Sequence, residues 1–297
     1  MPAVRKPADA LAVTMMIVLC MCWGFNQITI KTAAAGISPI MQAGLRSVIA
    51  SALLLGWAQL RGIPLFRRDG TLKGGIAAGA LFAAEFVFIY VGLGHTTASR
   101  MVVFIYLAPC FTALGLQWFV PGERLNAGQW TGVALAFLGV ALAFADGFST
   151  AAGSTLIGDA FGVIAALLWA ATTVLIRSTK LSSASATKTL FYQLGISALA
   201  LPLASLLAGE PGIVALTPKV VASLAYQSVI VAFASYLAWF WLLTRYLAGR
   251  LAVFSFLTPM FGVAFGVIFL SEPLSAAFVG AALLVGAGIV LVNRPAK

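Results

Sequence analysis

The sequence predicts an all-α integral membrane protein with ten transmembrane helices, arranged as two inverted five-helix repeats. Of its 297 residues, 62% are hydrophobic and only 9% are charged, whereas about 25% of the residues in a soluble domain are charged. Apolar windows of the ~20 residues that a helix needs to cross a bilayer recur along the whole chain. The second half also repeats motifs of the first, which predicts two domains, residues 1–150 and 151–297.

The ten apolar windows follow one another with connections too short for a separate soluble domain. The first window is long and continues through polar residues without a small-residue cleavage site, which indicates a membrane span and not a cleaved signal peptide. Each of the others has the length and composition of a span. We expect helices over residues 10–35, 39–60, 73–93, 98–119 and 127–146 in the first repeat, and over 156–178, 187–208, 220–244, 251–270 and 276–293 in the second.

Two motifs of the first half recur in the second half and indicate the repeat. Residues 23–26, Trp-Gly-Phe-Asn, correspond to residues 169–172, Trp-Ala-Ala-Thr, and the segment 98–109 reappears as 248–259 with Arg and Pro at the same places. Because five spans per repeat is an odd number, the second repeat enters the membrane from the opposite side. Such inverted repeats place a substrate site near the membrane midplane, between the halves, and allow alternating access to it.

The net charge of +10 has a topological explanation. With a cytoplasmic N-terminus, the alternate loops place most Lys and Arg residues on the cytoplasmic side and only Lys31, Arg100 and Lys219 on the opposite side. This positive-inside bias predicts that both termini are cytoplasmic. The basic residues then anchor the helices and contact anionic membrane lipids, and they do not indicate nucleic-acid binding.

Several of these residues resemble those of a known family. The similarity to EamA-type exporters of the drug/metabolite transporter superfamily is carried by residues 23–26, Arg46 in the second span, and the paired segments around Pro109/Glu123 and Pro259/Glu272. The resemblance covers essentially the whole chain and implies a secondary transporter of the bacterial inner membrane that exports amino acids and related metabolites. The aromatic content is similar to that of aromatic and broad-range amino-acid exporters. The second repeat has Thr172 where the pattern has Asn, so a role of Asn26 is not carried over to it.

Two ionisable residues lie inside predicted spans. Glu85 is in the middle of the third span, where an ionised carboxylate costs at least ~2.5–3.5 kcal/mol, so we expect it to face protein or a wet cavity. There it binds a cationic group, exchanges a proton, or forms an interhelical hydrogen bond. Arg46 in the second span binds a substrate carboxylate, pairs with Glu85, or extends toward a lipid headgroup; of these, a structural role is favoured.

The other candidate substrate-binding residues are polar or aromatic side chains inside the spans. Asn26 and Thr173 offer hydrogen bonds near the axis between the repeats, although such side chains also join helices in static bundles. Deep aromatic residues suit an apolar substrate chamber. Tyr90 lies about 140° around the helix from Glu85, so only a wide cavity contacts both. The predicted substrate-binding set is Trp23, Asn26, Glu85, Tyr90, Tyr106, Trp169, Thr173 and Trp239.

Pro109 and Pro259 occupy matched positions in the fourth and ninth spans. Each removes a backbone hydrogen bond and favours a kink. In a transporter such paired kinks are gating hinges, whereas in a static bundle they only shape the packing. Because a proline stands at this position in both repeats, we expect Pro109 and Pro259 to act as gating hinges.

The sequence gives no indication of a metal site, a cofactor or an enzyme. Cys20, Cys22 and Cys110 have neither zinc-ligand spacing nor a disulfide framework, and the single histidine, His95, ends the third span. There is no Walker A motif for ATP, and no Ser-His-Asp or His-Glu-x-x-His arrangement that would indicate a hydrolase.

Three functions follow from these patterns. The preferred one is export of amino acids, including aromatic and other apolar ones, by alternating access, with protons as a candidate coupling ion. The second is transport of another metabolite, such as an organic cation or a nucleotide sugar, although few basic residues lie near the midplane to bind a diphosphate. The third is a polytopic membrane enzyme or scaffold.

Overall fold

The computed structural model describes residues 5–149, 155–270 and 276–294. All regular secondary structure in these residues is helical, which confirms the predicted all-α fold. Eight spans have the length and apolar composition that a membrane crossing requires, and two shorter apolar helices accompany them. The uninterrupted helices are α1 (Ala10–Ala33), α2 (Pro39–Leu60), α3 (Leu72–Leu93), α6 (Ala127–Ala143), α8 (Leu156–Ser178), α9 (Ala186–Leu207) and α14 (Ala276–Asn293).

Two further spans are interrupted just before a proline. The fourth consists of α4 (Ala98–Ile105) and α5 (Ala108–Phe119); the ninth consists of α12 (Ala248–Ala252), a 3-10 helix over Val253–Phe256, and α13 (Leu257–Leu270). Pro109 and Pro259 follow these breaks, because a proline ring clashes with the carbonyl four residues earlier and its nitrogen donates no hydrogen bond. The kinks expected from the sequence are therefore present.

The eighth span is interrupted in a way that the sequence pattern does not predict. It begins as α10 (Pro218–Ala225), continues as a π-helix over Tyr226–Ser235 and ends as α11 (Tyr236–Arg245), with no proline or glycine in the π-helical part. The hydroxyls of Ser228 and Ser235 each donate to the carbonyl four residues earlier, at 2.7 and 2.6 Å. The same kind of bond occurs in the uninterrupted helices α2 and α8, at Ser47 and Thr172, so the hydroxyls alone do not explain the π-helix.

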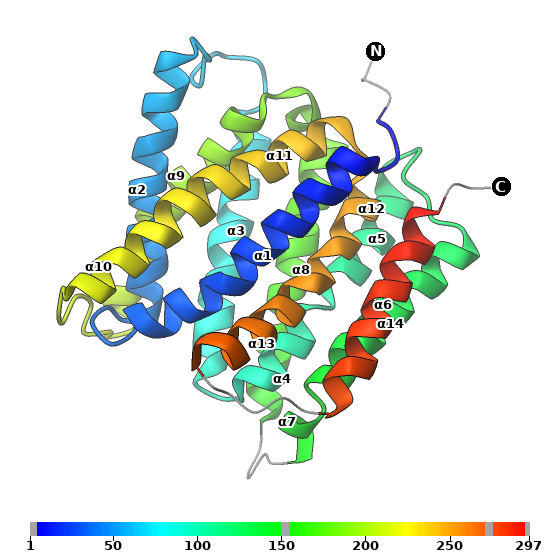
Figure 1. Cartoon of the computed structure of the whole chain (residues 1–297). Helices are drawn as coiled ribbons and strands as arrows, with labels where there is room; N and C mark the ends of the chain where they lie inside the picture. Colours follow the sequence, from blue (N-terminus) through cyan, green and yellow to red (C-terminus); the bar gives the residue numbers. More distant parts are fainter. Residues whose placement is uncertain (1–4, 150–154, 271–275, 295–297) are drawn as a thin grey trace.

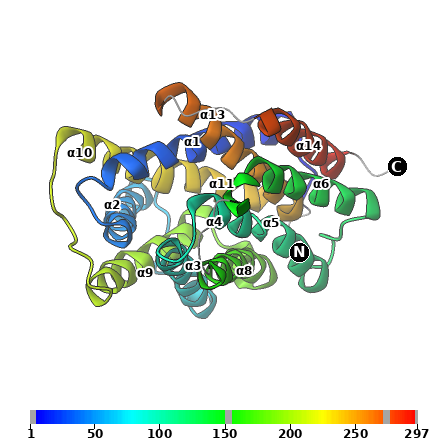
Figure 2. The ribbon, with the colours of Figure 1, turned by 90° about the horizontal axis from the view of Figure 1, so that it is seen from below.

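The helices form two walls that face each other, with a helix pair at each edge (Figure 1, Figure 2). One wall consists of α1, α10–α11 and α12–α13, and the other consists of α3, α4–α5 and α8. At one edge α2 packs against α9, and at the other edge α6 packs against α14. The centre of the bundle is therefore enclosed by the two walls and by α2 and α9.

Close backbone contact holds the α6–α14 edge together. A Cβ atom added to Gly132 would lie 2.7 Å from the carbonyl oxygen of Gly288, and one added to Gly288 would meet the carbonyl oxygen of Gly132 in return. Small residues permit this approach at membrane-helix interfaces. A larger side chain at either position would push the two helices apart.

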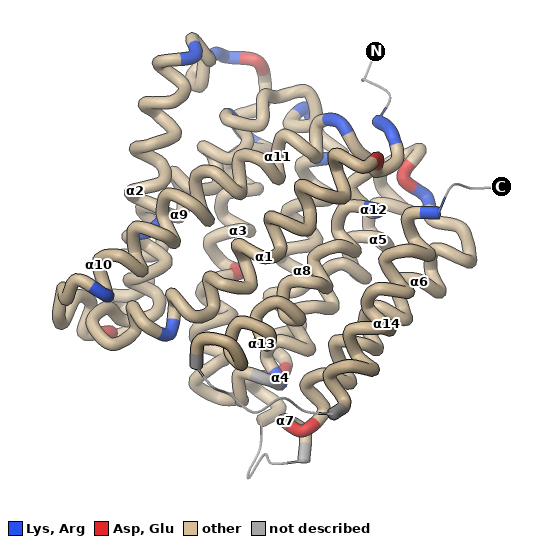
Figure 3. The backbone as a smooth tube through the Cα atoms, in the orientation of Figure 1, with Lys and Arg blue, Asp and Glu red and all other residues tan. Residues whose placement is uncertain are grey.

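Basic residues gather at one end of the bundle. Figure 3 shows most Lys and Arg residues at the end that also holds both chain termini, and few at the opposite end, near α10 and α4. We refer to these as the charge-rich and charge-poor ends. The distribution agrees with the alternate-loop pattern read from the sequence.

Candidate functional site

A cavity of about 310 Å³ lies between the two walls. Residues from both walls and from α2 and α9 line it. The structure brings together all eight predicted substrate-binding residues in this lining: Trp23, Asn26, Glu85, Tyr90, Tyr106, Trp169, Thr173 and Trp239. Pro109 also lines the cavity, whereas Pro259 is buried elsewhere in α13. Substrate binding by the eight residues and hinge motion at the two prolines stay predictions.

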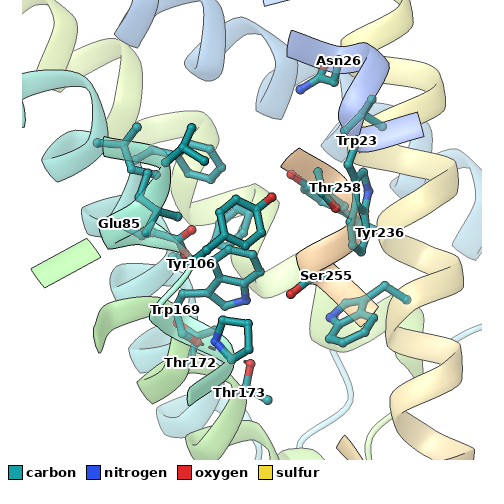
Figure 4. Close-up of a pocket in the computed structure, with 18 of the residues that line it drawn as sticks. Trp23, Asn26, Glu85, Tyr106, Trp169, Thr172, Thr173, Tyr236, Ser255 and Thr258 are labelled. Atoms are coloured by element: carbon teal, nitrogen blue, oxygen red, sulfur yellow. Dashed lines mark hydrogen bonds between the residues drawn. The ribbon is translucent and has the colours of Figure 1, made fainter. Parts of the chain in front are cut away.

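The two walls present matched sets of side chains to the cavity. Figure 4 shows Glu85, Tyr106 and Trp169 on one side of the space. These residues come from α3, the break between α4 and α5, and α8. On the opposite side lie Trp23, Tyr236 and Thr258, from α1, α11 and α13. A solute in the cavity would thus contact both walls at once.

Edge-to-face aromatic contacts hold the rings that line the cavity. The Trp23 ring lies 6.3 Å from Tyr236 and 6.0 Å from Trp239, measured between centroids, and its Nε1 donates a 2.8 Å hydrogen bond to Ser235 Oγ. On the other wall, the Tyr106 and Trp169 rings are 6.1 Å apart. Such T-shaped pairs are preferred by aromatic quadrupoles. The cavity is therefore mainly apolar, with rings fixed by their neighbours.

Arg46 is the basic residue of the lining, and it is almost fully buried, with 2% of its surface exposed. Its guanidinium carbon lies 4.6 Å from the centroid of the Phe86 ring. Among the described residues, no carboxylate lies within ion-pair distance of it, and its Nε and Nη2 atoms have no hydrogen-bond acceptor. Arg46 thus forms no ion pair with Glu85 and does not extend to a headgroup, which were two of the alternatives expected from the sequence.

Glu85 is the acidic residue of the lining. Its side chain lies on α3, is 7% exposed, and borders the same cavity as Arg46. Among the described residues, Glu85 and Arg46 form no ion pair. The site therefore holds one carboxyl group and one guanidinium in a mainly apolar space.

The neutral polar residues of the lining are mostly bonded within their own helices. Asn26 Oδ1 accepts a hydrogen bond from Thr29 Oγ1 at 3.1 Å. Thr172 and Thr173 donate to carbonyls one turn earlier on α8, at 2.8 and 3.4 Å. Their oxygen lone pairs remain available to a donor in the cavity.

Several lining residues were not among the predicted set. Gln193 on α9 is 1% exposed and its Nε2 has no acceptor in the described part of the chain; Thr258 Oγ1 also has no partner there. Tyr236 follows the π-helix directly, and Ser255 lies in the 3-10 helix. Ser255 and Thr258 do have a signal in the sequence, because they lie just before Pro259, whereas Gln193 has none.

The two ends of the cavity differ in exposure. At the charge-poor end, the lining residues Leu93 and Ala98 are exposed to solvent. At the charge-rich end, Ile176, Phe240 and Ala252 are buried, with 5–7% of their surface exposed. The lining is thus exposed at the charge-poor end, which we call the open end of the cavity, and buried at the charge-rich end, which we call the closed end.

A buried polar cluster lies beyond the closed end of the cavity. Arg177, at the end of α8, forms an ion pair with Glu123 in the α5–α6 connection and donates to the carbonyl of Leu243 on α11 at 3.0 Å. Glu123 Oε2 also accepts from the backbone amide of Gly249 on α12 at 3.1 Å. We call this cluster the latch, because it joins α8 and the α5–α6 connection to α11 and α12 of the opposite wall.

Known proteins share both the sequence pattern and the fold. The model of the EamA-like transporter family matches residues 10–145 and 156–294. A protein of Escherichia coli (strain K12) named as a probable amino-acid metabolite efflux pump is 27% identical over 273 residues, 88% of each chain. An uncharacterized transporter of Archaeoglobus fulgidus is 29% identical over 267 residues, also 88% of each chain. A crystal structure with 17% identity superposes over 96% of both chains with a TM-score of 0.80, which shows a common fold.

Proposed function

The chain belongs to the EamA-like transporter family, and we propose that it exports amino acids and related metabolites across the bacterial inner membrane by alternating access. The observation that carries this proposal is the cavity between the two walls, which is open at one end, closed at the other, and lined by aromatic rings with one carboxylate and one guanidinium. A volume of about 310 Å³ suits a small solute.

The halves of the chain, residues 1–150 and 151–297, form the two inverted repeats of this transporter. The packing supports this: α1 packs on α13 as α8 packs on α5, and the pairs α2–α9 and α6–α14 each join corresponding helices of the two halves. The family model also matches the chain in two separate segments. An inverted repeat provides two related conformations, because each half can adopt the packing of the other.

The charge-rich end faces the cytoplasm in this proposal. The excess of Lys and Arg at that end supports the orientation through the positive-inside rule, and it puts both termini on the cytoplasmic side. The cavity of this conformation then communicates with the outside, and the latch of Glu123, Arg177 and Gly249 separates it from the cytoplasm. Export requires the latch to open so that a cytoplasmic solute can enter.

Amino acids are the proposed substrates for two reasons. The Escherichia coli relative is named as a probable amino-acid metabolite efflux pump, as is one of Salmonella typhimurium that is 25% identical. The aromatic lining, from Trp23 to Trp239, also suits aromatic and other apolar side chains. Glu85 is the residue that we propose to bind and release the coupling proton.

The test is counterflow of labelled amino acids in liposomes that contain the purified protein. We expect flux of aromatic and branched apolar amino acids, and a loss of more than about tenfold in Trp169→Ala, since Trp169 lines the cavity. Trp118→Ala is the matched control, because Trp118 is 69% exposed on α5. No flux for any amino acid of a broad panel would overturn the proposal.

A further inference from the structure

We propose that Arg46 and Gln193 form a carboxylate-binding subsite in the cavity, so that the transporter selects solutes that carry a carboxylate. The inference rests on the proposed function and adds the chemical group that substrates must share. It starts from two buried side chains on different helices, α2 and α9, that both line the cavity and both keep donors without an acceptor.

The first observation is the state of the Arg46 guanidinium. Burying an arginine without a partner is costly, and buried charges are normally paired or hydrogen-bonded. Yet in the described part of the chain Nε and Nη2 of Arg46 have no acceptor and no carboxylate lies within 4.0 Å. A carboxylate with two oxygens can accept two parallel hydrogen bonds from one guanidinium, which is the preferred geometry of such pairs.

Gln193 provides the second, independent observation. It is 1% exposed and its Nε2 group has no acceptor among the described residues. Gln193 on α9 and Arg46 on α2 both line the cavity, and these two helices pack against each other. Neither residue provides an oxygen that satisfies the donors of the other, so the missing acceptor would come from a solute.

The surroundings of Arg46 favour a singly charged anion. The guanidinium carbon lies over the Phe86 ring, 4.6 Å from the ring centroid, which is a cation–π contact. Arg46 is the sole Lys or Arg among the described lining residues. One guanidinium balances the single charge of a carboxylate and bonds to both of its oxygens, whereas a doubly charged phosphate or a diphosphate would keep excess negative charge in the apolar cavity. Glu85, also in the lining, would face the ammonium group of the same solute.

Paired probes test the subsite. L-phenylalanine and L-leucine are compared in counterflow with the amines that lack only their carboxylate, phenethylamine and isoamylamine. Wild type should transport the amino acids and transport the amines at least about tenfold more slowly, since a charge-assisted hydrogen bond contributes that much or more. R46Q should lose amino-acid flux by at least about tenfold while amine flux does not fall. Arg61→Gln, an exposed arginine at the end of α2, is the matched control.

A second variant keeps the test decisive if R46Q does not fold. Gln193→Glu adds a carboxyl group to the same cavity lining that holds the Arg46 donors. We expect this variant to fold, to melt no lower than wild type, and to lose amino-acid flux, because the new carboxylate competes with that of the solute. If Arg46 had only a structural role, the amino-acid flux of this variant should equal that of wild type. Equal transport of amines and amino acids by wild type, or undiminished amino-acid flux in Q193E, would overturn the subsite and leave the proposed function intact. Failure of wild type to transport any probe or any panel amino acid would overturn both.

Discussion

At the scale of single residues, the cavity brings a carboxylate and a guanidinium into one apolar space without pairing them. Glu85 and Arg46 are both buried and both line the cavity, on α3 and α2. Charges inside a membrane protein are costly, and they are kept where they interact with one another, with water or with a solute. Neither group has an ion-pair partner among the described residues, which is why we propose a role toward the solute for each of them.

Glu85→Gln tests the proposed proton coupling. Glu85 is the one Asp or Glu among the described residues of the lining, so the amide, which cannot bind a proton, should make flux independent of an imposed pH gradient. The wild-type flux should respond to the same gradient in liposomes. Asp9→Asn is the control, because Asp9 caps α1 outside the cavity and asparagine caps a helix equally well. A gradient response of wild-type size in Glu85→Gln would contradict this role.

Asp69 gives a prediction for stability. The ammonium of Lys188, 2.8 Å away, and the hydroxyl of Thr71 hold the pKa of Asp69 below its usual value near 3.8. Because the pKa is lower in the folded state, the carboxylate stabilises the protein above pH ~4, and this contribution is lost as the pH falls toward the folded-state pKa. Asp69→Asn should melt below wild type at pH 7, and the difference should shrink below pH ~4. A difference that stays constant down to pH 3 would argue against the pair.

The sequence could identify eight residues that line the cavity, and those it missed have a physical reason. Charged and large aromatic residues inside a span are costly or unusual, so Glu85 and Trp169 are recognisable without a structure. Neutral polar residues such as Gln193 occur on many faces of membrane helices, where they often join helices. Only the packing of α9 against α2 shows that Gln193 borders the cavity.

At the scale of elements, the breaks in the helices are concentrated around the cavity. Tyr106 lies at the break between α4 and α5, Ser255 in the 3-10 helix before α13, and Tyr236 directly after the π-helix, and all three line the cavity. The first two breaks were predictable from Pro109 and Pro259. The π-helix was not, because its ten residues contain no proline or glycine and the hydropathy pattern there is that of an ordinary span.

Pro259→Ala tests the hinge. Alanine restores the missing backbone donor and favours a continuous helix, so we expect the maximal counterflow rate to fall several-fold. The half-saturation concentration should stay near that of wild type, since Pro259 does not line the cavity. Pro218→Ala, at the first turn of α10 where proline causes no break, is the control. A Pro259→Ala variant with the wild-type maximal rate would exclude the hinge.

At the scale of the whole molecule, two walls and two edges enclose the cavity, and the proposed transport cycle opens it at either end in turn. The edges α2–α9 and α6–α14 pair corresponding helices of the proposed repeats, while the walls contact each other at the latch. The sequence predicted ten helical segments in the right places from hydropathy alone. It could not predict which end of the cavity is closed, because closure depends on the contacts of Glu123 and Arg177, far apart in sequence.

Opening of the latch can be followed by labelling. Removing one partner of a buried ion pair costs ~3–5 kcal/mol, so Glu123→Gln should shift the protein toward the conformation open at the charge-rich end. A cysteine at Phe240, buried at that end of the cavity, should then react faster with a membrane-impermeant maleimide added from that side. The native residues Cys20, Cys22 and Cys110 are first replaced by alanine. Asp69→Asn, at the same end but outside the latch, should leave the labelling rate unchanged.

A reversible cross-link across the latch tests alternating access most directly. Cysteines at Glu123 and Gly249, whose side-chain oxygen and amide nitrogen are 3.1 Å apart, are joined by a short cleavable bismaleimide in the cysteine-free protein, and counterflow of labelled L-phenylalanine and L-leucine is measured in liposomes. The account predicts that flux stops when the link forms and returns when it is cleaved. Undiminished flux through fully cross-linked protein would contradict it.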